Sequence, residues 1–451
     1  MTSSDLRRRA AALARRLGLR PAPPVVPRSN GRLAFVGPMP PAATGIATYD
    51  RALLEGLGRI GALDRHAMDV LWPIHRAHRR EIVGYELGVY QLGNNIEFHR
   101  DVYRLAVAAP GLVVLHDLAM DGFVRELEAS GDPLGREAMS EAAAVPLRST
   151  DPDVTLHDPL RVAWCAAVVR AARGVVVHSE FGRRYLEAAG TRTPVFVVPH
   201  PAVETAGAIE RARRDAGELR SSLTARGVRA LLVAPGDVNE TKQHGATVGA
   251  LSGLPSDVHL AIVGRPSRTY DVGRLVRRHG VGDRVSTHLD VSDEGFLAWL
   301  AAADVVVDLR YPHRGEVSGS LIRSMQLGKP TIVSATGTYL DVPEETVRRV
   351  SPGPTDVAEL REAIASLLDD RALRDRIGGA AADRIRRVTA SDATARGYER
   401  AITATIELVR DPEHLVLERW SRSLVELGID EGMVADGYGL SYARGIRDLA
   451  G

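Results

Sequence analysis

The stretch 308–334 constrains the fold more than any other part of this 451-residue chain. Its pattern predicts the end of a strand, a glycine-containing loop, a short helix and a further strand over Thr331–Val333. Ser318 is a favourable helix N-cap, and Gly328 followed by Pro330 ends the helix. A helix start behind small residues presents free amides and the positive end of the helix dipole, which suit a phosphate group. Two interpretations follow, a nucleotide-binding turn or an ordinary βα turn of an α/β sheet.

The alternation of strand and helix recurs in two blocks of the chain. In the first block we expect strands at Leu33–Val36, Leu112–Leu115, Val175–Val177 and Phe196–Val198. In the second block we expect strands at Ala230–Val233, His259–Val263, Val285–His288 and Val305–Val307, and a helix over Phe296–Ala303. A charged, helical stretch over 204–226 separates the blocks, as is typical of a junction between domains. The sequence therefore predicts two doubly wound, Rossmann-like α/β lobes that face each other across a cleft.

Composition argues against several other classes of protein. The formal net charge of +1 gives no overall attraction to nucleic acid. The single cysteine, Cys165, has no partner for an internal disulfide, which fits a reducing cytosol. Neither a long apolar run nor an apolar N-terminal core is present, so we expect a cytoplasmic protein without a transmembrane helix or a signal peptide. The loop after Val36 lacks the glycine triplet of a dinucleotide-binding turn, which argues against NAD.

The first residues form a basic arm that stands apart from the lobes. Leucines and alanines fall on one helical face between Leu6 and Leu17, and arginines fall mostly elsewhere. The prolines from Pro21 to Pro27 make a stiff linker. One interpretation is a helix docked on the protein by its apolar stripe, and the other is a peripheral contact with an anionic membrane.

Three predicted strands of the first block end beside a histidine, namely His116, His178 and His200. A histidine at the carboxyl end of a strand can contact a substrate or can be satisfied by local backbone. We expect the backbone interpretation for His178 and His200. The spacing of the three residues is not that of metal ligands, so the sequence predicts no metal site.

The loop and helix of the stretch 308–334 resemble the donor-site signature of glycosyltransferase family 4, a retaining family with the GT-B fold. The match is carried by Gly315-Glu316-Val317-Ser318-Gly319 and by Gly328-Lys329-Pro330. A subgroup with a Gly-Glu-x-Ser-Gly loop is the most similar. The family has two glutamates eight residues apart, and here Gly315 and Arg323 stand at those positions. The resemblance therefore assigns the donor-site carboxylate to Glu316.

Other motifs extend the resemblance over roughly residues 32–427. Lys242, six residues after Gly236, has the spacing of the family's diphosphate-binding lysine. The family commonly has an arginine directly after that glycine. This chain has Asp237 there, which leaves Arg265 and Arg323 as candidates for the missing phosphate contact. The resemblance also places four further segments at the substrates: the loop with Gly45 and Ile46, the acceptor-side pair His116 and Asp117, the turn Gly264-Arg265, and the backbone at Asp290-Val291.

The resemblance implies an enzyme of bacterial type that transfers a sugar from a nucleoside diphosphate sugar to an acceptor hydroxyl, with retention and without a metal or other cofactor. The acceptor is a glycan, a lipid-linked glycan or a small molecule. The expected catalytic residues are His116, Asp117, Lys242 and Glu316. The expected donor-binding residues are Gly45, Ile46, Gly236, Lys242, Gly264, Arg265, Val291, Glu316, Val317, Ser318, Gly319 and Arg323.

The predicted domains are a basic arm (1–28), an acceptor lobe (29–204), a donor lobe (205–408) and a helical segment (409–451) that crosses back to the first lobe. Two alternatives remain. One is a nucleotide-sugar epimerase of the same fold, which converts the donor without an acceptor. The other is a catalytically weak subunit that binds a nucleotide sugar or a partner enzyme, an idea supported by Asp237 and Arg323 at positions where the family has other residues.

Overall fold

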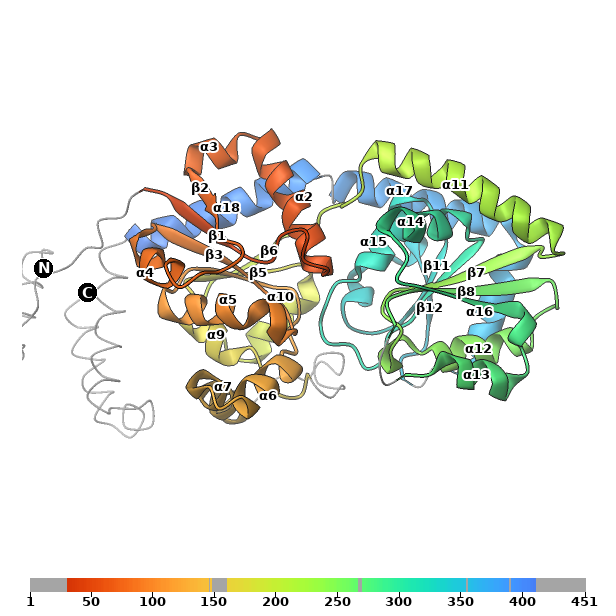
Figure 1. Cartoon of the computed structure of the whole chain (residues 1–451), viewed down its shortest axis with the longest axis horizontal. Helices are drawn as coiled ribbons and strands as arrows, with labels where there is room; N and C mark the ends of the chain where they lie inside the picture. The colour runs from red at the N-terminus through yellow and green to blue at the C-terminus, as the bar shows by residue number, and fades with distance from the viewer. Residues whose placement is uncertain are drawn as a thin grey trace, which may run out of the picture.

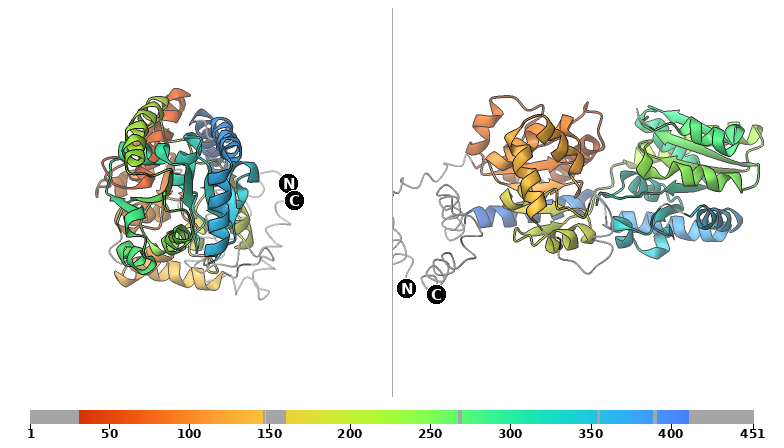
Figure 2. Two further views of the ribbon diagram at one scale, coloured as in Figure 1. Left: turned by 90° about the vertical axis from the view of Figure 1, so that its right-hand side faces the viewer. Right: turned by 90° about the horizontal axis from the view of Figure 1, so that it is seen from below.

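The computed structural model describes residues 31–145, 147, 160–266, 270–353, 356–388 and 391–410. They form two lobes that lie side by side, each built on a six-stranded parallel sheet (Figures 1 and 2). The predicted fold class, two Rossmann-like α/β lobes, is therefore confirmed.

The first lobe has a sheet in the order β2-β1-β3-β4-β5-β6. Its strands are β1 (Leu33–Val36), β2 (Met68–Val70), β3 (Leu87–Leu92), β4 (Leu112–Leu115), β5 (Gly174–Val177) and β6 (Val195–Val197). Its helices are α2 (Gly45–Arg59), α3 (Ala62–His66), α4 (His78–Glu81), α5 (Ile96–Ala108), α6 (Asp121–Ala129), α7 (Pro133–Ala144), α9 (Ala166–Ala171) and α10 (Glu180–Ala188).

The second lobe has a sheet in the order β12-β11-β10-β7-β8-β9. Its strands are β7 (Ala230–Pro235), β8 (Val258–Gly264), β9 (Val285–Leu289), β10 (Val305–Asp308), β11 (Thr331–Ser334) and β12 (Arg348–Val350). Its helices are α11 (Ala206–Ala225), α12 (His244–Ser252), α13 (Val272–His279), α14 (Asp293–Ala302), α15 (Gly319–Gln326), α16 (Val357–Asp369) and α17 (Arg371–Val388). Two short 3₁₀ turns, η2 (Glu240–Lys242) and η4 (Gly337–Asp341), lie in the loops after β7 and β11.

Each sheet is buried on both faces, which is why its strands are continuous apolar runs. In β1, Leu33 and Phe35 face a core shared with α2, whereas Ala34 and Val36 face a core on the opposite side of the sheet. The second sheet is covered in the same way, by α11 and α14 on one face and by α12 and α16 on the other.

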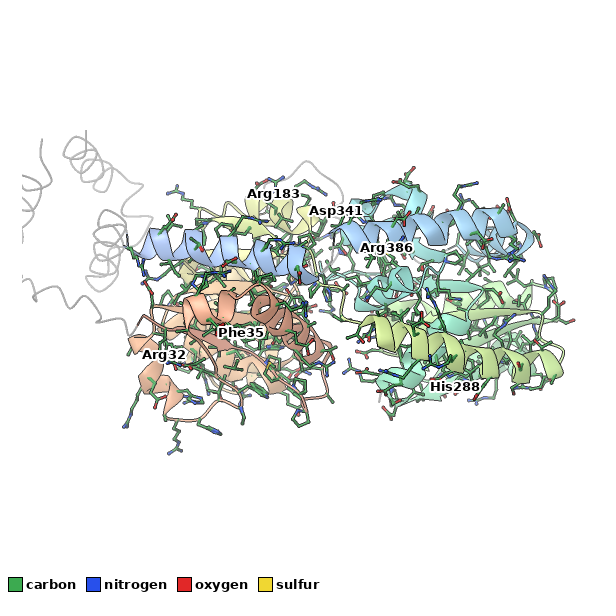
Figure 3. The ribbon with its side chains drawn as sticks, turned by 90° about the horizontal axis from the view of Figure 1, so that it is seen from above. Arg32, Phe35, Arg183, His288, Asp341 and Arg386 are labelled. Carbon is green, nitrogen blue, oxygen red and sulfur yellow. The ribbon has the colours of Figure 1, made fainter. Side chains whose placement is uncertain are left out.

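The last described helix, α18 (Ser391–Arg410), crosses back to the first lobe (Figures 1 and 3). Tyr398 and Ile402 are buried in the core that contains Leu33 and Phe35. From the sequence, residues 391–408 were expected in the second lobe and the crossing segment at 409–451, a range of which the structure describes only residues 409 and 410. The crossing begins earlier because α18 supplies side chains that the first core would otherwise lack.

No helix within the described part of the chain combines the length and the apolar character needed to cross a bilayer. The expected basic arm, residues 1–28, lies outside the described residues.

Candidate functional site

The carboxyl ends of the two sheets point at each other. After β4, the amides of Leu118 and Ala119 donate to the carbonyl of Arg314 in the loop after β10, at 3.1 and 3.0 Å. After β8, Arg265 donates to the carbonyl of Ala43 in the loop after β1, at 2.9 Å. In doubly wound sheets ligands bind beyond the carboxyl ends of the strands, where the strand order reverses. These reversals lie between β1 and β3 and between β7 and β10, so both candidate sites face the contact between the lobes.

The turn after β7 brings Gly236 against Gly264. Gly236 has φ +107°, a backbone conformation that favours glycine, and a Cβ at Gly264 would lie 1.8 Å from the Gly236 carbonyl oxygen. The amide of Asp290 donates to the Gly264 carbonyl at 3.0 Å, which brings the half-buried Val291 to the same end of the sheet. A side chain at Gly264 would force these loops apart, and one at Gly236 would lie 3.0 Å from the end of the Lys242 side chain.

Lys242 lies at the end of η2 and is buried beneath this turn. Its Nζ is 2.6 Å from Oδ1 of Asp308, the last residue of β10. The other carboxylate oxygen of Asp308 accepts from the Ser318 hydroxyl at 2.6 Å and from the Tyr339 hydroxyl at 3.1 Å. Burial lowers the pKa of Lys242, and the charge of Asp308 offsets part of that shift. The lysine is therefore fixed in a network that joins η2, β10, the N-cap of α15 and η4.

Ser318 is the N-cap of α15, as the sequence predicts. Its hydroxyl oxygen accepts from the amide of Leu321 at 3.2 Å while the same hydroxyl donates to Asp308. A Cβ at Gly319 would meet no atom within 4 Å, so the first turn of the helix is open to a ligand. The start of α15 and the ammonium of Lys242 thus share Asp308 as a common anchor.

Glu316 does not present an unengaged carboxylate. It forms a buried ion pair with Arg310, and its second oxygen accepts from the amide of Arg314 at 2.6 Å. Burial acts to raise the pKa of Glu316, but Arg310, a backbone hydrogen bond and the nearby His313 together hold that pKa below its usual range. The neighbouring Val317 packs against the apolar cluster under α15.

Arg265 and Arg323 both have acidic partners. Arg265 forms two bonds with Asp237, at 2.7 and 2.9 Å. The Nε of Arg323 donates to Glu204 at 2.7 Å, and its guanidinium lies over the ring of Phe296 at 5.7 Å. Arg323 therefore points to the segment that links the lobes.

On the first lobe, Thr44 caps α2, whose first residues are Gly45 and Ile46. A Cβ at Gly93, in the loop after β3, would lie 2.5 Å from the end of the Ile46 side chain. The loop before α2 therefore closes over the reversal point of the first sheet.

His116 belongs to a cluster of rings at that sheet end. The ring of Tyr49 lies 4.6 Å from that of His116, 5.1 Å from His178 and 4.8 Å from His200. His116 Nε2 bonds the side-chain oxygen of Gln91 at 2.9 Å. Burial lowers the pKa of all three imidazoles, to about 4 for His178 and about 3 for His200, so they are neutral at pH 7.

The backbone partners expected for two of these histidines are present. His178 Nδ1 bonds the Val198 carbonyl at 2.9 Å, and His200 Nδ1 bonds the Pro201 carbonyl at 2.8 Å. Asp117 accepts from the amide of Asn94 at 2.9 Å. Burial and the nearby charge of Glu316 raise the pKa of Asp117 to about 6. The acceptor-side pair is thus brought close to the donor loop across the contact between the lobes.

From the sequence, Tyr49 entered only as the tyrosine that follows Gly45-Ile46, and no role was predicted for Gln91, Asp308, Arg310 or Tyr339. Asp308 and Arg310 lie at the carboxyl end of a predicted strand, and that position was a usable signal. Tyr49, Gln91 and Tyr339 join the site only through packing between distant segments.

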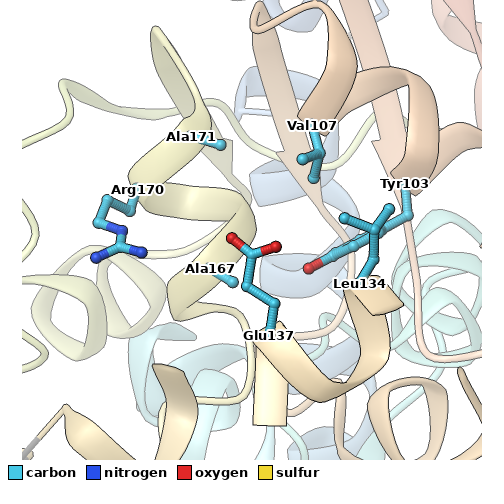
Figure 4. Close-up of a pocket in the computed structure, with 7 residues that line it drawn as sticks. All are labelled: Tyr103, Val107, Leu134, Glu137, Ala167, Arg170 and Ala171. Carbon is cyan, nitrogen blue, oxygen red and sulfur yellow. The ribbon is translucent and has the colours of Figure 1, made fainter. Parts of the chain in front are cut away.

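Two cavities lie away from this network. One of about 110 Å³ lies between α5, α7 and α9, with Glu137, Arg170 and Tyr103 among its lining residues (Figure 4). Another, of about 220 Å³, lies between Arg51 and the α11–α14 pair. Both are smaller than the 300–1,000 Å³ typical of ligand pockets. No group of three or more His, Cys, Asp or Glu side chains in the described part of the chain is arranged to hold a metal ion.

Residues 215–384 match the family described as Glycosyl transferases group 1. The second lobe is thus a glycosyltransferase domain. No curated protein matches the sequence.

Solved structures with the same two-lobed fold include three that cover most of this chain. Sucrose-phosphate synthase from Thermosynechococcus elongatus is 18% identical, with a TM-score of 0.57, over 83% of this chain and 100% of that one. HepE from Anabaena in complex with UDP is 15% identical, with a TM-score of 0.58, over 83% and 100%. A glycosyltransferase from Rickettsia africae is 12% identical, with a TM-score of 0.52, over 85% and 100%. At these identities the likeness establishes the GT-B fold.

Proposed function

We propose that this protein is a retaining glycosyltransferase of family 4 that moves a sugar from a nucleoside diphosphate sugar to an acceptor hydroxyl. The observation that carries the proposal is the buried network of Lys242, Asp308 and Ser318 at the strand-order reversal of the second sheet. It holds an ammonium and the start of α15 at one place, inside a region that matches the glycosyltransferase family.

The chemistry of the leaving group accounts for this arrangement. When the sugar leaves, negative charge grows on the β-phosphate, and positive groups aimed there stabilise the transition state more than the ground state. An ammonium has three N–H donors, of which the bond to Asp308 uses one. Asp308 therefore orients Lys242 and leaves donors for phosphate oxygens. The free amides at the start of α15 add a second source of positive potential.

The first lobe is assigned to the acceptor. A neutral imidazole both donates and accepts, which suits a sugar hydroxyl, and His116 is held by Gln91. Retention is proposed to follow a front-face course, in which the leaving phosphate takes the proton of the acceptor hydroxyl. Glu316, paired with Arg310, then shapes the donor loop and does not attack the sugar.

A thermal-shift screen with UDP, GDP and ADP tests donor binding. A ligand at one hundred times its dissociation constant adds about 2.7 kcal/mol of stability, and the matching nucleosides serve as controls. Absence of any shift with all three diphosphates would contradict the proposal.

Product analysis then tests the reaction. Incubation with the matching nucleotide sugars and a panel of acceptor sugars is expected to give a glycoside with the donor's anomeric configuration. Conversion of the donor to its epimer without acceptor would favour the epimerase alternative. Binding of the nucleotide sugar with neither turnover nor hydrolysis of the donor would favour a nucleotide-sugar-binding subunit.

A further inference from the structure

Five cations lie around the proposed donor site, and each has a carboxylate partner. The pairs are Lys242–Asp308, Arg265–Asp237, Arg310–Glu316, Arg314–Asp121 and Arg323–Glu204. A diphosphate carries more than one negative charge, and the ammonium of Lys242 already has Asp308 as its counter-charge. A second cation is therefore needed, and the surroundings of these arginines differ enough to choose among them.

We propose that Arg310 is the second residue that binds the donor diphosphate, working beside Lys242. This inference rests on the proposed function and names a further residue of the proposed donor site. Arg310 follows β10, the strand that neighbours β7 at the reversal point of the second sheet. Its charge acts on Lys242, Asp308 and Asp117, so it lies at the centre of the network and near the facing lobe.

The bonding of Arg310 is incomplete. One end nitrogen of its guanidinium pairs with Glu316, whereas its Nε is buried and has no hydrogen-bond partner among the described residues. The side chain as a whole is 16% exposed, so it is not sealed from a ligand. The edge formed by Nε and the remaining end nitrogen matches two oxygens of one phosphate.

The position of Arg310 next to Lys242 is unfavourable without an anion. The buried ammonium of Lys242 and the partly buried guanidinium of Arg310 repel each other, and Arg310 contributes to the lowered pKa of Lys242. A phosphate group between them would remove this repulsion and would satisfy the unpaired N–H.

The other arginines are less suitable. Arg265 is more than half exposed, and its guanidinium already donates hydrogen bonds to Asp237 and to the carbonyl of Ala43. Arg323 points to the linker, and Arg314 reaches across to Asp121 of the first lobe. Burial, position and the unpaired Nε therefore favour Arg310 over the other arginines.

The test compares Arg310→Met with Arg314→Met in the full-length chain. The probe is whichever of UDP, GDP and ADP stabilises the wild type most, with its nucleoside as the uncharged control. Isothermal titration is expected to show a 10- to 150-fold loss of diphosphate affinity for Arg310→Met and less than a twofold change for the nucleoside. Arg314→Met is expected to bind both like the wild type, and Arg310→Lys to recover part of the loss.

A folding defect is handled by a second pair of variants. Removal of Arg310 leaves Glu316 without its partner, so Glu316→Gln is compared with Glu316→Gln/Arg310→Met, which contains no unpaired carboxylate at this position. The same selective loss of diphosphate binding is expected within this pair.

Equal loss of diphosphate and nucleoside affinity, or unchanged diphosphate affinity, would show that Arg310 acts only on the shape of the loop and would overturn the inference. A wild-type chain that binds no nucleoside diphosphate would instead refute the proposed function itself.

Discussion

The Lys242–Asp308 pair predicts a strong energetic coupling between η2, in the loop after β7, and the end of β10. Lys242→Met removes the ammonium and leaves the Asp308 carboxylate fully buried, with only the hydroxyls of Ser318 and Tyr339 as donors. Breaking a buried pair in this way costs about 3–5 kcal/mol. Asp308→Asn leaves Lys242 buried without a counter-charge and is expected to cost a similar amount.

The double variant Lys242→Met/Asp308→Asn contains neither charge. We expect it to lose about 1–3 kcal/mol, far less than the sum of the two single losses, because no uncompensated ion stays buried. Urea unfolding followed by circular dichroism at pH 7 measures all three free energies. Lys329→Met is the matched control, since the ammonium of Lys329 lies in the same lobe and donates to the carbonyl of Ala303 at 3.0 Å. This control is expected to lose about 1–2 kcal/mol.

Additivity is the result that would refute this reasoning. If the double variant loses the sum of the single losses within about 0.5 kcal/mol, the two charges do not stabilise each other in the folded protein. Equal losses for Lys242→Met and Lys329→Met would show that the charge of Asp308 stabilises a lysine no more than the neutral carbonyl of Ala303 does.

Three further predictions concern the acceptor side and the arm. The pKa of Asp117 is about 6 in the folded protein against 3.8 ordinarily, so the free energy of unfolding falls as the pH rises from about 4 to about 6. Above pH 6 this loss amounts to about 3 kcal/mol. Asp117→Asn should remove the loss and flatten Tm between pH 4 and 8. An unchanged pH profile of Tm would contradict it. His116→Ala should lower turnover at least 100-fold while changing nucleoside diphosphate affinity less than twofold, and equal losses would indicate a structural histidine. Deletion of residues 1–27 should leave turnover of a soluble acceptor within a few-fold; complete loss in a folded truncation would refute this, and lost binding to anionic vesicles would favour the membrane alternative.

Local patterns were sufficient to predict most of the strands and the start of α15. Buried parallel strands are unbroken apolar runs, and a serine before a glycine is a recognisable cap. Three strands were not predicted: β2, which has only three residues with Asp69 at its centre, β3, in which Gly88 and Gln91 interrupt the run, and β12, which begins with two arginines. Their places in the sheet depend on pairing with neighbouring strands, which a single window of sequence does not contain.

The site was harder to predict because its charges are paired over long distances along the chain. Lys242 and Asp308 are separated by 66 residues, and Arg323 and Glu204 by 119. Spacing within one motif identifies a lysine beside a glycine turn, but it does not reveal which carboxylate will neutralise it. The three histidines were visible in sequence, whereas their common contact with Tyr49 depends on how α2 packs on the sheet.

The return of α18 to the first lobe has a consequence for synthesis of the protein. Phe35 and Ile402 share one core, although 402 − 35 = 367 residues separate them. At about 5–20 residues per second, a ribosome makes the second of these residues roughly 20–70 seconds after the first. The core of the second lobe, which extends from Ala212 in α11 to Ile385 in α17, is complete before that. The lobe that is made first is therefore the last to finish folding, and a nascent chain stopped before α18 exposes an unfilled apolar surface to the cell.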